Sequence, residues 1–327
     1  MEMVLTHRTS ILFLLLIVVS GTMLTGSAQA VQAGSESVPA YELPQSTLIY
    51  VSDYFSFVGA DSHGRVAFAL DNNRGRDGDA YQAEHFVVLH DERKGWIDVQ
   101  GNGFYDNSKK ELALIPDSPF FQFESTPEAG LTITSAKNQL TLRMNPLSQR
   151  TLRTDGKSTI WMGSAPAVLT WQRRTIPGRV IYEYLVMPDF NRLTRTYFGL
   201  WNNFQGLYLL ADTTGDVYFH SQRSERIAAL AGKLVGFSVL NEQTDALKGL
   251  QVEVLGRDFA LGFYRWPTTW KVMWKGAKGP ASMTLTLAEQ KKIANWVIGG
   301  FSMGIVRGEL LYDGHTWPIY GLAELIM

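Results

Sequence analysis

The chain has 327 residues, a formal net charge of −1, 45% hydrophobic residues and no cysteine. The nearly neutral charge gives no indication of binding to nucleic acid or to an anionic membrane, and a chain without cysteine has neither disulfides nor a cysteine-linked lipid anchor. The length predicts one large or two medium domains, whose hydrophobic core holds the fold unaided.

The N-terminal segment predicts a secretory signal. Residues 1–10 are weakly basic, 11–24 are almost wholly apolar, and Ala28-Gln29-Ala30 has the small-x-small pattern of a cleavage site. We expect cleavage after Ala30 and a periplasmic or secreted protein, with a retained N-terminal anchor as the alternative. Later apolar patches are all shorter than about 18 residues, so no membrane span is expected after cleavage.

The remaining chain predicts an all-β protein. Residues 31–46 are rich in Gly, Ser, Ala and Pro and indicate a flexible lead-in. From residue 47 onward apolar residues recur with period two, and Gly, Asn, Asp and Pro separate the runs, as in short strands joined by turns. Such runs include LIYVSDYFSFV, RVAFAL, HFVVLH, GLTITSA, QLTLRM, VIYEYLVM, LQVEVLG, SMTLTLA and WPIYGLAEL. Only 224–234 and 286–297 have the pattern of short helices.

About seventeen predicted strands exceed one small barrel. We therefore expect two antiparallel β-barrels or half-barrels of about eight strands each, with one or two short helices. The expected domains are residues 47–190 and 191–327, joined near the polar, Pro-containing zone at 187–206.

Three tryptophans recur four residues apart in RWPTTWKVMW, at Trp266, Trp270 and Trp274. Pro267 and the β-branched residues around it favour a strand, which places all three indoles on one face. They either pack in the core or line a wide cavity, apolar or sugar-stacking. Trp266 and Trp270 are therefore candidate ligand-binding residues.

Two short motifs carry little weight. GFSMG at 300–304 matches the G-x-S-x-G nucleophile elbow, but a strand-like segment follows it, and only the 23 residues 305–327 remain. We expect a Gly-rich bend in a strand instead. His85 and His90 lack the frame of a zinc site, and EF-hand frames begun at Asp71 or Asn73 fail. No cofactor or metal is expected, although calcium in a looser loop at 71–84 stays open.

The stretch ALDNNRGRDGDAYQAEH, at 69–85, concentrates polar residues between two apolar runs. One interpretation is a solvated hairpin loop that begins as the strand leaves the sheet near Asp71, with Arg74 and Arg76 paired to Asp77, Asp79 or Glu84. The other is that its side chains line a barrel mouth, where a carboxylate or histidine can move a proton. On the second interpretation the catalytic candidates are Asp71, Glu84 and His85, and the ligand-binding candidates are Arg74 and Gln82.

Two further polar and aromatic groups occur later in the chain. One comprises Tyr197, Trp201, Asn202, Asn203 and Gln205, of which Tyr197, Trp201 and Asn203 are candidate ligand-binding residues. The other is Tyr218 and His220, on alternating positions of one predicted strand. Tyr218 is a candidate for ligand binding, and His220 is a fourth catalytic candidate.

The C-terminal pattern Gly308…Tyr312-Asp313-Gly314…Pro318-Ile319-Tyr320-Gly321-Leu322-Ala323-Glu324, in an exported all-β chain of two halves, resembles the two-domain lipocalin-like family of AttH proteins and carotenoid 1,2-hydratases. That family shares its fold with some Diels–Alderases and tocopherol cyclase. The resemblance implies two calycin barrels and an apolar cavity for a lipid- or isoprenoid-like ligand. In the hydratases, acid residues protonate an alkene before water adds. The Trp-Gly-x-Arg motif of some members is replaced here by LWNNFQG, which bears on activity more than on fold.

Three functional hypotheses follow. The first is an exported protein that binds a hydrophobic small molecule in a barrel cavity, with polar groups at the rim. The second is an enzyme of the hydratase or cyclase type, whose polar side chains converge on an enclosed cavity. The third is a carbohydrate-binding or carbohydrate-cleaving sandwich with exposed tryptophans and two nearby carboxylates. The identity of the ligand and the oligomeric state do not follow from the residues.

Overall fold

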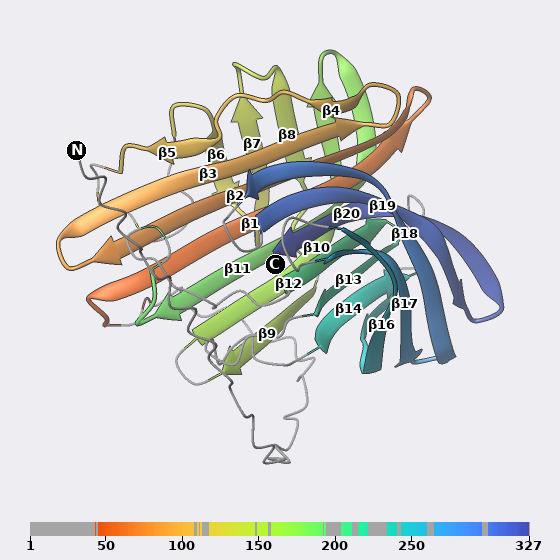
Figure 1. Ribbon diagram of the computed structural model, residues 1–327. Helices are drawn as coiled ribbons and strands as arrows, with labels where there is room; N and C mark the ends of the chain where they lie inside the picture. The colour runs from red at the N-terminus through yellow and green to blue at the C-terminus, as the bar shows by residue number, and fades with distance from the viewer. Residues whose placement is uncertain are drawn as a thin grey trace, which may run out of the picture. The chain divides into compact units, whose positions relative to one another are not determined.

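The structure, a computed structural model, describes residues 43, 45–107, 110, 112, 118–147, 149–155, 158–191, 193, 204–210, 215–221, 234–240, 243–259, 265–295 and 300–326. Within these ranges the protein is all-β, with twenty strands in two antiparallel sheets (Figure 1). The predicted fold class is confirmed. No helix long and apolar enough to cross a membrane occurs in the same ranges.

The first sheet contains eleven strands in the order β4-β3-β2-β1-β11-β10-β8-β7-β6, with β5 paired to β3 and β9 to β10. The strands are β1 (Leu48–Asp61), β2 (Gly64–Asp77), β3 (Ala80–Asp91), β4 (Gly95–Ile97), β5 (Gly103–Tyr105), β6 (Gln122–Thr126), β7 (Gly130–Ser135), β8 (Leu140–Met144), β9 (Gln149–Asp155), β10 (Ser158–Trp171) and β11 (Arg174–Pro188).

The second sheet contains nine strands in the order β15-β14-β13-β12-β20-β19-β18-β17-β16. The strands are β12 (Phe204–Leu210), β13 (Asp216–Ser221), β14 (Leu234–Leu240), β15 (Gln243–Ala246), β16 (Lys248–Phe259), β17 (Arg265–Gly276), β18 (Gly279–Asn295), β19 (Gly300–Tyr312) and β20 (His315–Ile326). Along the chain, the last strand of the first sheet ends at Pro188 and the first strand of the second sheet begins at Phe204. The change from one sheet to the other therefore falls within the polar zone at 187–206. All described residues belong to one compact unit, Val31–Met327, so the division into two domains stays a prediction.

Both faces of the central strands of the first sheet are buried. On β1, Val51 and Phe55 point to a core enclosed by the first sheet, which we call the inner face. Tyr50 and Tyr54 point the opposite way, into a core that includes Met303 and other residues of the second sheet. We call this second side the shared face. Because side chains alternate along a strand, parity alone decides which face each residue of β1, β2, β3 and β11 occupies.

The second sheet has a core of its own. Trp266, Trp270 and Trp274 lie on one face of β17, as the four-residue spacing predicts, and pack there with Leu285 and Leu310. Their exposed fractions are 5%, 0% and 4%. The three indoles therefore fill a core.

The predicted helix at 286–297 is wrong, because β18 continues as strand to Asn295. Pairing with β19 is interrupted by register shifts between Leu287 and Glu289 and between Lys292 and Ala294. Each shift changes which face the following residues occupy, so the apolar pattern departs from period two and resembles a helix. The other predicted helix, 224–234, lies outside the described residues except for Leu234, which opens β14.

The segment GFSMG lies within β19, as expected for a Gly-rich strand. Ser302 is fully buried and its Oγ accepts a hydrogen bond of 2.8 Å from Gln290 Nε2. Residues of β19 flank Ser302 on both sides, so the chain is extended where a nucleophile elbow requires a turn.

The polar stretch at 69–85 is mostly strand, so the prediction that the chain leaves the sheet at Asp71 is wrong. Residues up to Asp77 of β2 pair with β1 and β3, and the turn is only Gly78-Asp79, where Gly78 has φ +58°. The backbone of this stretch is therefore largely paired in the sheet, and no group of three or more His, Cys, Asp or Glu side chains that could hold a metal ion occurs among the described residues.

Candidate functional site

Polar residues at consecutive positions of β1 supply both faces of the first sheet. In the sequence YVSDYFS, Ser52 and Tyr54 belong to the shared face, and Asp53 belongs to the inner face. Each face therefore carries its own polar cluster, although the two clusters come from the same strands.

The inner face contains a buried ion pair. Arg74 Nη2 donates to Asp53 Oδ2, and both side chains have 0% exposure. Tyr182 donates its hydroxyl to Asp53 Oδ1 at 2.6 Å, and Arg74 also donates to the carbonyls of Leu112 and Asn72, at 3.2 and 3.3 Å. Burial acts to lower the pKa of Arg74, but the charge and hydrogen bond of Asp53 outweigh it and raise the pKa.

His85 lies beside this pair on the inner face. Its ring packs against Tyr105 and Phe121, with centroid distances of 4.3 and 5.2 Å, and its Nδ1 is 3.4 Å from Ser118 Oγ. Burial, followed by the charge of Arg74, lowers the pKa of His85 to about 3, so the imidazole is neutral at physiological pH.

Asn72 is directly opposite His85 in the β2–β3 register. Its Oδ1 accepts a hydrogen bond of 2.7 Å from the Tyr105 hydroxyl. Its Nδ2 and His85 Nε2 are both buried, and neither has a hydrogen-bond partner in the part of the chain that the structure describes. The two side chains thus present unused polar atoms on the same face.

The shared face carries a row of acidic groups around a phenol. Tyr54 of β1 is directly opposite Asp71 on β2 and Glu183 on β11. Burial, and then the charges of Glu324 on β20, Asp71 and Glu183, raise the pKa of Tyr54 well above its usual value. Ser52 Oγ donates to Asp71 Oδ1 at 2.6 Å.

Apolar side chains from both sheets surround this acidic row. They are Ile160, Met162, Ile181, Leu185 and Met187 of the first sheet, and Met303, Ile305 and Leu322 of the second. Glu183 is buried, whereas Asp71 and Glu324 are partly exposed. The shared face therefore combines an apolar wall with acidic groups that reach toward solvent and a phenol that stays protonated.

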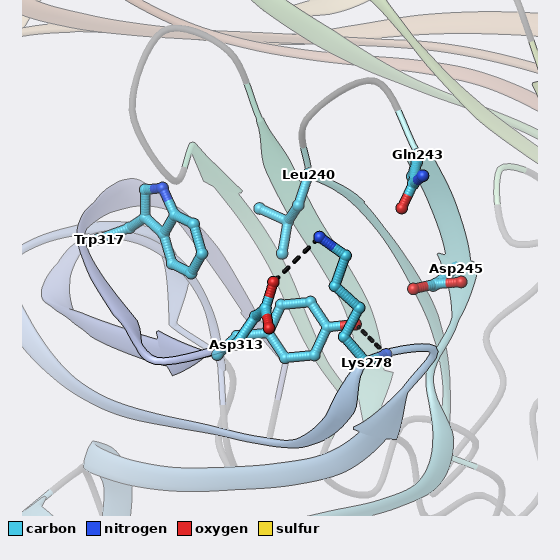
Figure 2. A pocket seen from close by; sticks show the side chains of 7 residues that line it. Leu240, Gln243, Asp245, Lys278, Asp313 and Trp317 are labelled. Carbon is cyan, nitrogen blue, oxygen red and sulfur yellow. Dashed lines mark hydrogen bonds and ion pairs between the residues drawn. The ribbon is translucent and has the colours of Figure 1, made fainter.

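A small pocket at the end of the second sheet is a different kind of feature (Figure 2). Lys278 Nζ pairs with Asp313 Oδ2 at 2.9 Å, and the Lys278 backbone N–H donates to the Tyr312 hydroxyl. Leu240, Gln243, Asp245 and Trp317 complete the lining. The volume open to the centre of a water-sized sphere is about 10 Å³, roughly one water molecule, so a lipid-like ligand does not fit.

The sequence-predicted residues separate between the two faces. Arg74 and His85 point to the inner face, while Asp71, Gln82 and Glu84 share the parity of Phe86 and Val88 on the shared face. The predicted partners of Arg74 are wrong, because Arg74 pairs with Asp53. Asp71 and Glu84 are therefore on the side of the sheet opposite to His85.

The remaining predicted residues lie elsewhere or outside the described side chains. Trp266 and Trp270 are in the core of the second sheet. The residues Tyr197, Trp201, Asn202 and Asn203 lie outside the described residues, and only the backbone of Gln205, Tyr218 and His220 is described.

Sequence reasoning missed Asp53, Tyr54 and Glu183. A signal for Asp53 was present, because it has the same parity as Val51 and Phe55 in an otherwise apolar run. An ionisable residue at an inward position needs a partner, and that requirement points to Arg74.

Comparison with solved structures shows the same fold. An AttH candidate from Nitrosomonas europaea aligns with TM-score 0.54 and 11% identity, over 88% of this chain and 98% of that one. Kievitone hydratase from Nectria haematococca aligns with TM-score 0.55 and 11% identity, over 84% and 88% of the two chains. CghA aligns with TM-score 0.52 and 10% identity, over 90% and 95%. No protein-family model and no curated protein sequence matches the chain.

Proposed function

We propose that this chain, which shares the lipocalin-like fold of those proteins, is an exported protein that binds a hydrophobic small molecule at the shared face. The observation that carries the proposal is the Tyr54 phenol, set between Asp71 and Glu183 and near Glu324 of the second sheet. The apolar wall would contact the body of a lipid- or isoprenoid-like ligand, and the acidic row would contact its polar end.

Acidic side chains are costly on a largely apolar face. Carboxylates removed from water lose hydration, and like charges near one another add repulsion. Apolar residues of similar size at these positions would cost the fold less. A ligand group that donates hydrogen bonds to the carboxylates would offset both penalties, which supports a binding role.

A second candidate function is acid/base catalysis on such a ligand. Tyr54 keeps its proton over the physiological pH range, and the neighbouring carboxylates can accept or relay one. Protonation of a ligand alkene followed by addition of water would be a hydratase reaction, and one structural neighbour is a kievitone hydratase. The carbohydrate hypothesis loses support, since the tryptophans it needs on an exposed face are buried.

The test is a titration of the mature chain, residues 31–327, with farnesol, a neutral isoprenoid alcohol, followed by tryptophan fluorescence. We expect saturable binding that weakens about ten- to a hundredfold in Glu183→Gln, because a lost charge-assisted hydrogen bond is worth roughly 1.5–3 kcal/mol. Glu124→Gln, an exposed position on β6, is the matched control and should bind as the wild type does. Equal affinities in wild type and Glu183→Gln would remove the acidic row from the proposal.

Mass spectrometry of the incubated ligand separates binding from catalysis. An enzyme would convert an isoprenoid alkene to a product heavier by one water, and Asp71→Asn would slow the conversion. Recovery of unchanged ligand favours binding. Mass analysis of protein isolated from its source tests export: a chain that begins at Val31 supports cleavage after Ala30, and a chain that retains residues 1–30 contradicts it.

A further inference from the structure

The inner face contains polar atoms that the proposed function leaves unused. His85 Nε2 and Asn72 Nδ2 are buried without a hydrogen-bond partner among the described residues, and the two residues are 1% and 0% exposed. Leaving a polar atom unsatisfied in a protein interior costs about 1–3 kcal/mol, so two such atoms side by side indicate a partner that supplies the missing bonds.

Register places these two atoms within reach of one small group. Asn72 and His85 are directly opposite on β2 and β3, and the Cβ atoms of such a pair are about 4.5–5.5 Å apart. A single oxygen between the side chains can therefore contact both. Tyr105 already bonds Asn72 Oδ1, so only the Nδ2 end of that amide is available.

The charges around the site favour a neutral ligand. Asp53 and Arg74 already balance each other, so an added ion would be a buried charge without a counterion. His85 itself is neutral, since the pKa of its imidazole is lowered to about 3. The ligand must accept a hydrogen bond from Asn72 Nδ2, which only donates. A hydroxyl group does so and can also donate to, or accept from, His85 Nε2, whichever tautomer is present.

The aromatic surroundings favour a flat ring on that hydroxyl. The imidazole contacts the rings of Tyr105 and Phe121. Aromatic rings at this spacing pack well against a further ring. Tyr105 is half-buried and lies on β5, a strand of only three residues. Phe104, which precedes Tyr105 on that strand, is 65% exposed. The Tyr105 side of these two residues is therefore close to solvent.

We propose that Asn72 and His85 form a second binding site, which holds the hydroxyl of a small neutral aromatic alcohol of the phenol class. This site is on the side of the first sheet opposite to the shared face, and it does not depend on the function proposed there.

The experiment is a nuclear magnetic resonance titration of mature protein labelled with ¹⁵N-histidine, with phenol as the probe. We expect a saturable change in the His85 Nε2 resonance with phenol and none with toluene, which has the same ring without the hydroxyl. Asn72→Leu should weaken phenol binding about tenfold or more, because the substitution removes the Asn72 Nδ2 group that donates to the hydroxyl oxygen.

Two controls make the result specific. Asn73→Leu alters a neighbouring buried asparagine on the shared face and should retain the phenol response. Glu183→Gln, which tests the proposed function, should also retain it, so each proposal can fail alone. If Asn72→Leu does not fold, His85→Phe keeps an aromatic ring against Tyr105 and Phe121, and saturation transfer to phenol gives the readout.

Several outcomes would overturn the proposal. An equal response to toluene would show simple filling of apolar space. A phenol response that persists in Asn72→Leu would place the hydroxyl elsewhere. If phenol leaves the His85 Nε2 resonance unchanged and that nitrogen contacts only an ordered water, then water satisfies both atoms.

Discussion

Replacing Arg74 by methionine should destabilise the protein strongly, because it leaves the Asp53 carboxylate buried without its counterion. Both side chains have 0% exposure, and among the described residues the other donor to that carboxylate is the Tyr182 hydroxyl. Removing one partner of a buried pair costs about 3–5 kcal/mol. Total stabilities are about 5–15 kcal/mol, so this is a large fraction.

Replacing both members of the pair should cost less than replacing either one. In the double variant Asp53→Leu with Arg74→Met no charge is left buried, and the remaining loss is the set of neutral groups that each lose a bond, at about 1 kcal/mol each. These groups are the Tyr182 hydroxyl and the carbonyls of Leu112 and Asn72. We therefore expect a loss of roughly 2–3 kcal/mol for the double variant.

The assay is urea unfolding at pH 7 followed by tryptophan fluorescence, for wild type, both single variants and the double variant. Arg143→Met, an exposed arginine on β8, is the matched control and should unfold within about 0.5 kcal/mol of wild type. Additive losses in the double variant, or a loss below about 1 kcal/mol for Arg74→Met, would refute the reasoning.

Three further predictions concern other contacts. Arg174 donates hydrogen bonds to Asp61 and Asp91. The bond from Arg174 lowers the pKa of Asp61. Burial acts to raise the pKa of Asp91, but the bond from Arg174 outweighs it, so the pKa of Asp91 is also lowered. Their stabilisation is complete above the unfolded pKa of about 3.9 and is lost as the pH falls through the lowered values, so Arg174→Met should cost about 1–3 kcal/mol at pH 7 and clearly less at pH 2 in urea titrations; a pH-independent loss would contradict this. His90 bonds Tyr320 at 2.9 Å across the two sheets, so Tyr320→Phe should lower the unfolding free energy by about 1–3 kcal/mol, and an unchanged urea midpoint would contradict a role for that bond. A Cβ at Gly308 would lie 1.9 Å from the Thr284 carbonyl oxygen, so Gly308→Ala should cost about 1–3 kcal/mol by crowding β18 against β19, and a melting temperature equal to wild type would refute the close approach.

The strand pattern was predictable for particular reasons. Residues 48–58 alternate so regularly that the parity of Val51, Asp53 and Phe55 can be read from the chain. The spacing of the three tryptophans likewise predicts that they lie together on one face of β17. The predicted helix at 286–297 failed because the register shifts in β18, which arise from pairing with β19, alter the local pattern.

The candidate site was predictable only in part. The stretch at 69–85 identified Arg74, His85 and Asp71 as unusual, but it offered local partners for Arg74. The actual partner, Asp53, is 21 residues away on β1, and Tyr182, which completes the pair, is 129 residues from Asp53. Contacts of this kind depend on strand order, which no local pattern contains.

The sequence by itself determined that the protein is all-β and which side chains share a face, because alternation is a property of each strand alone. The tertiary structure decided that both faces of β1 and β2 are buried, since the inner face is enclosed by the first sheet and the shared face is covered by the second. That burial changes the meaning of the polar stretch at 69–85. Its residues are divided between the two faces of the sheet, and its fully buried charge, Arg74, is paired with Asp53 of another strand.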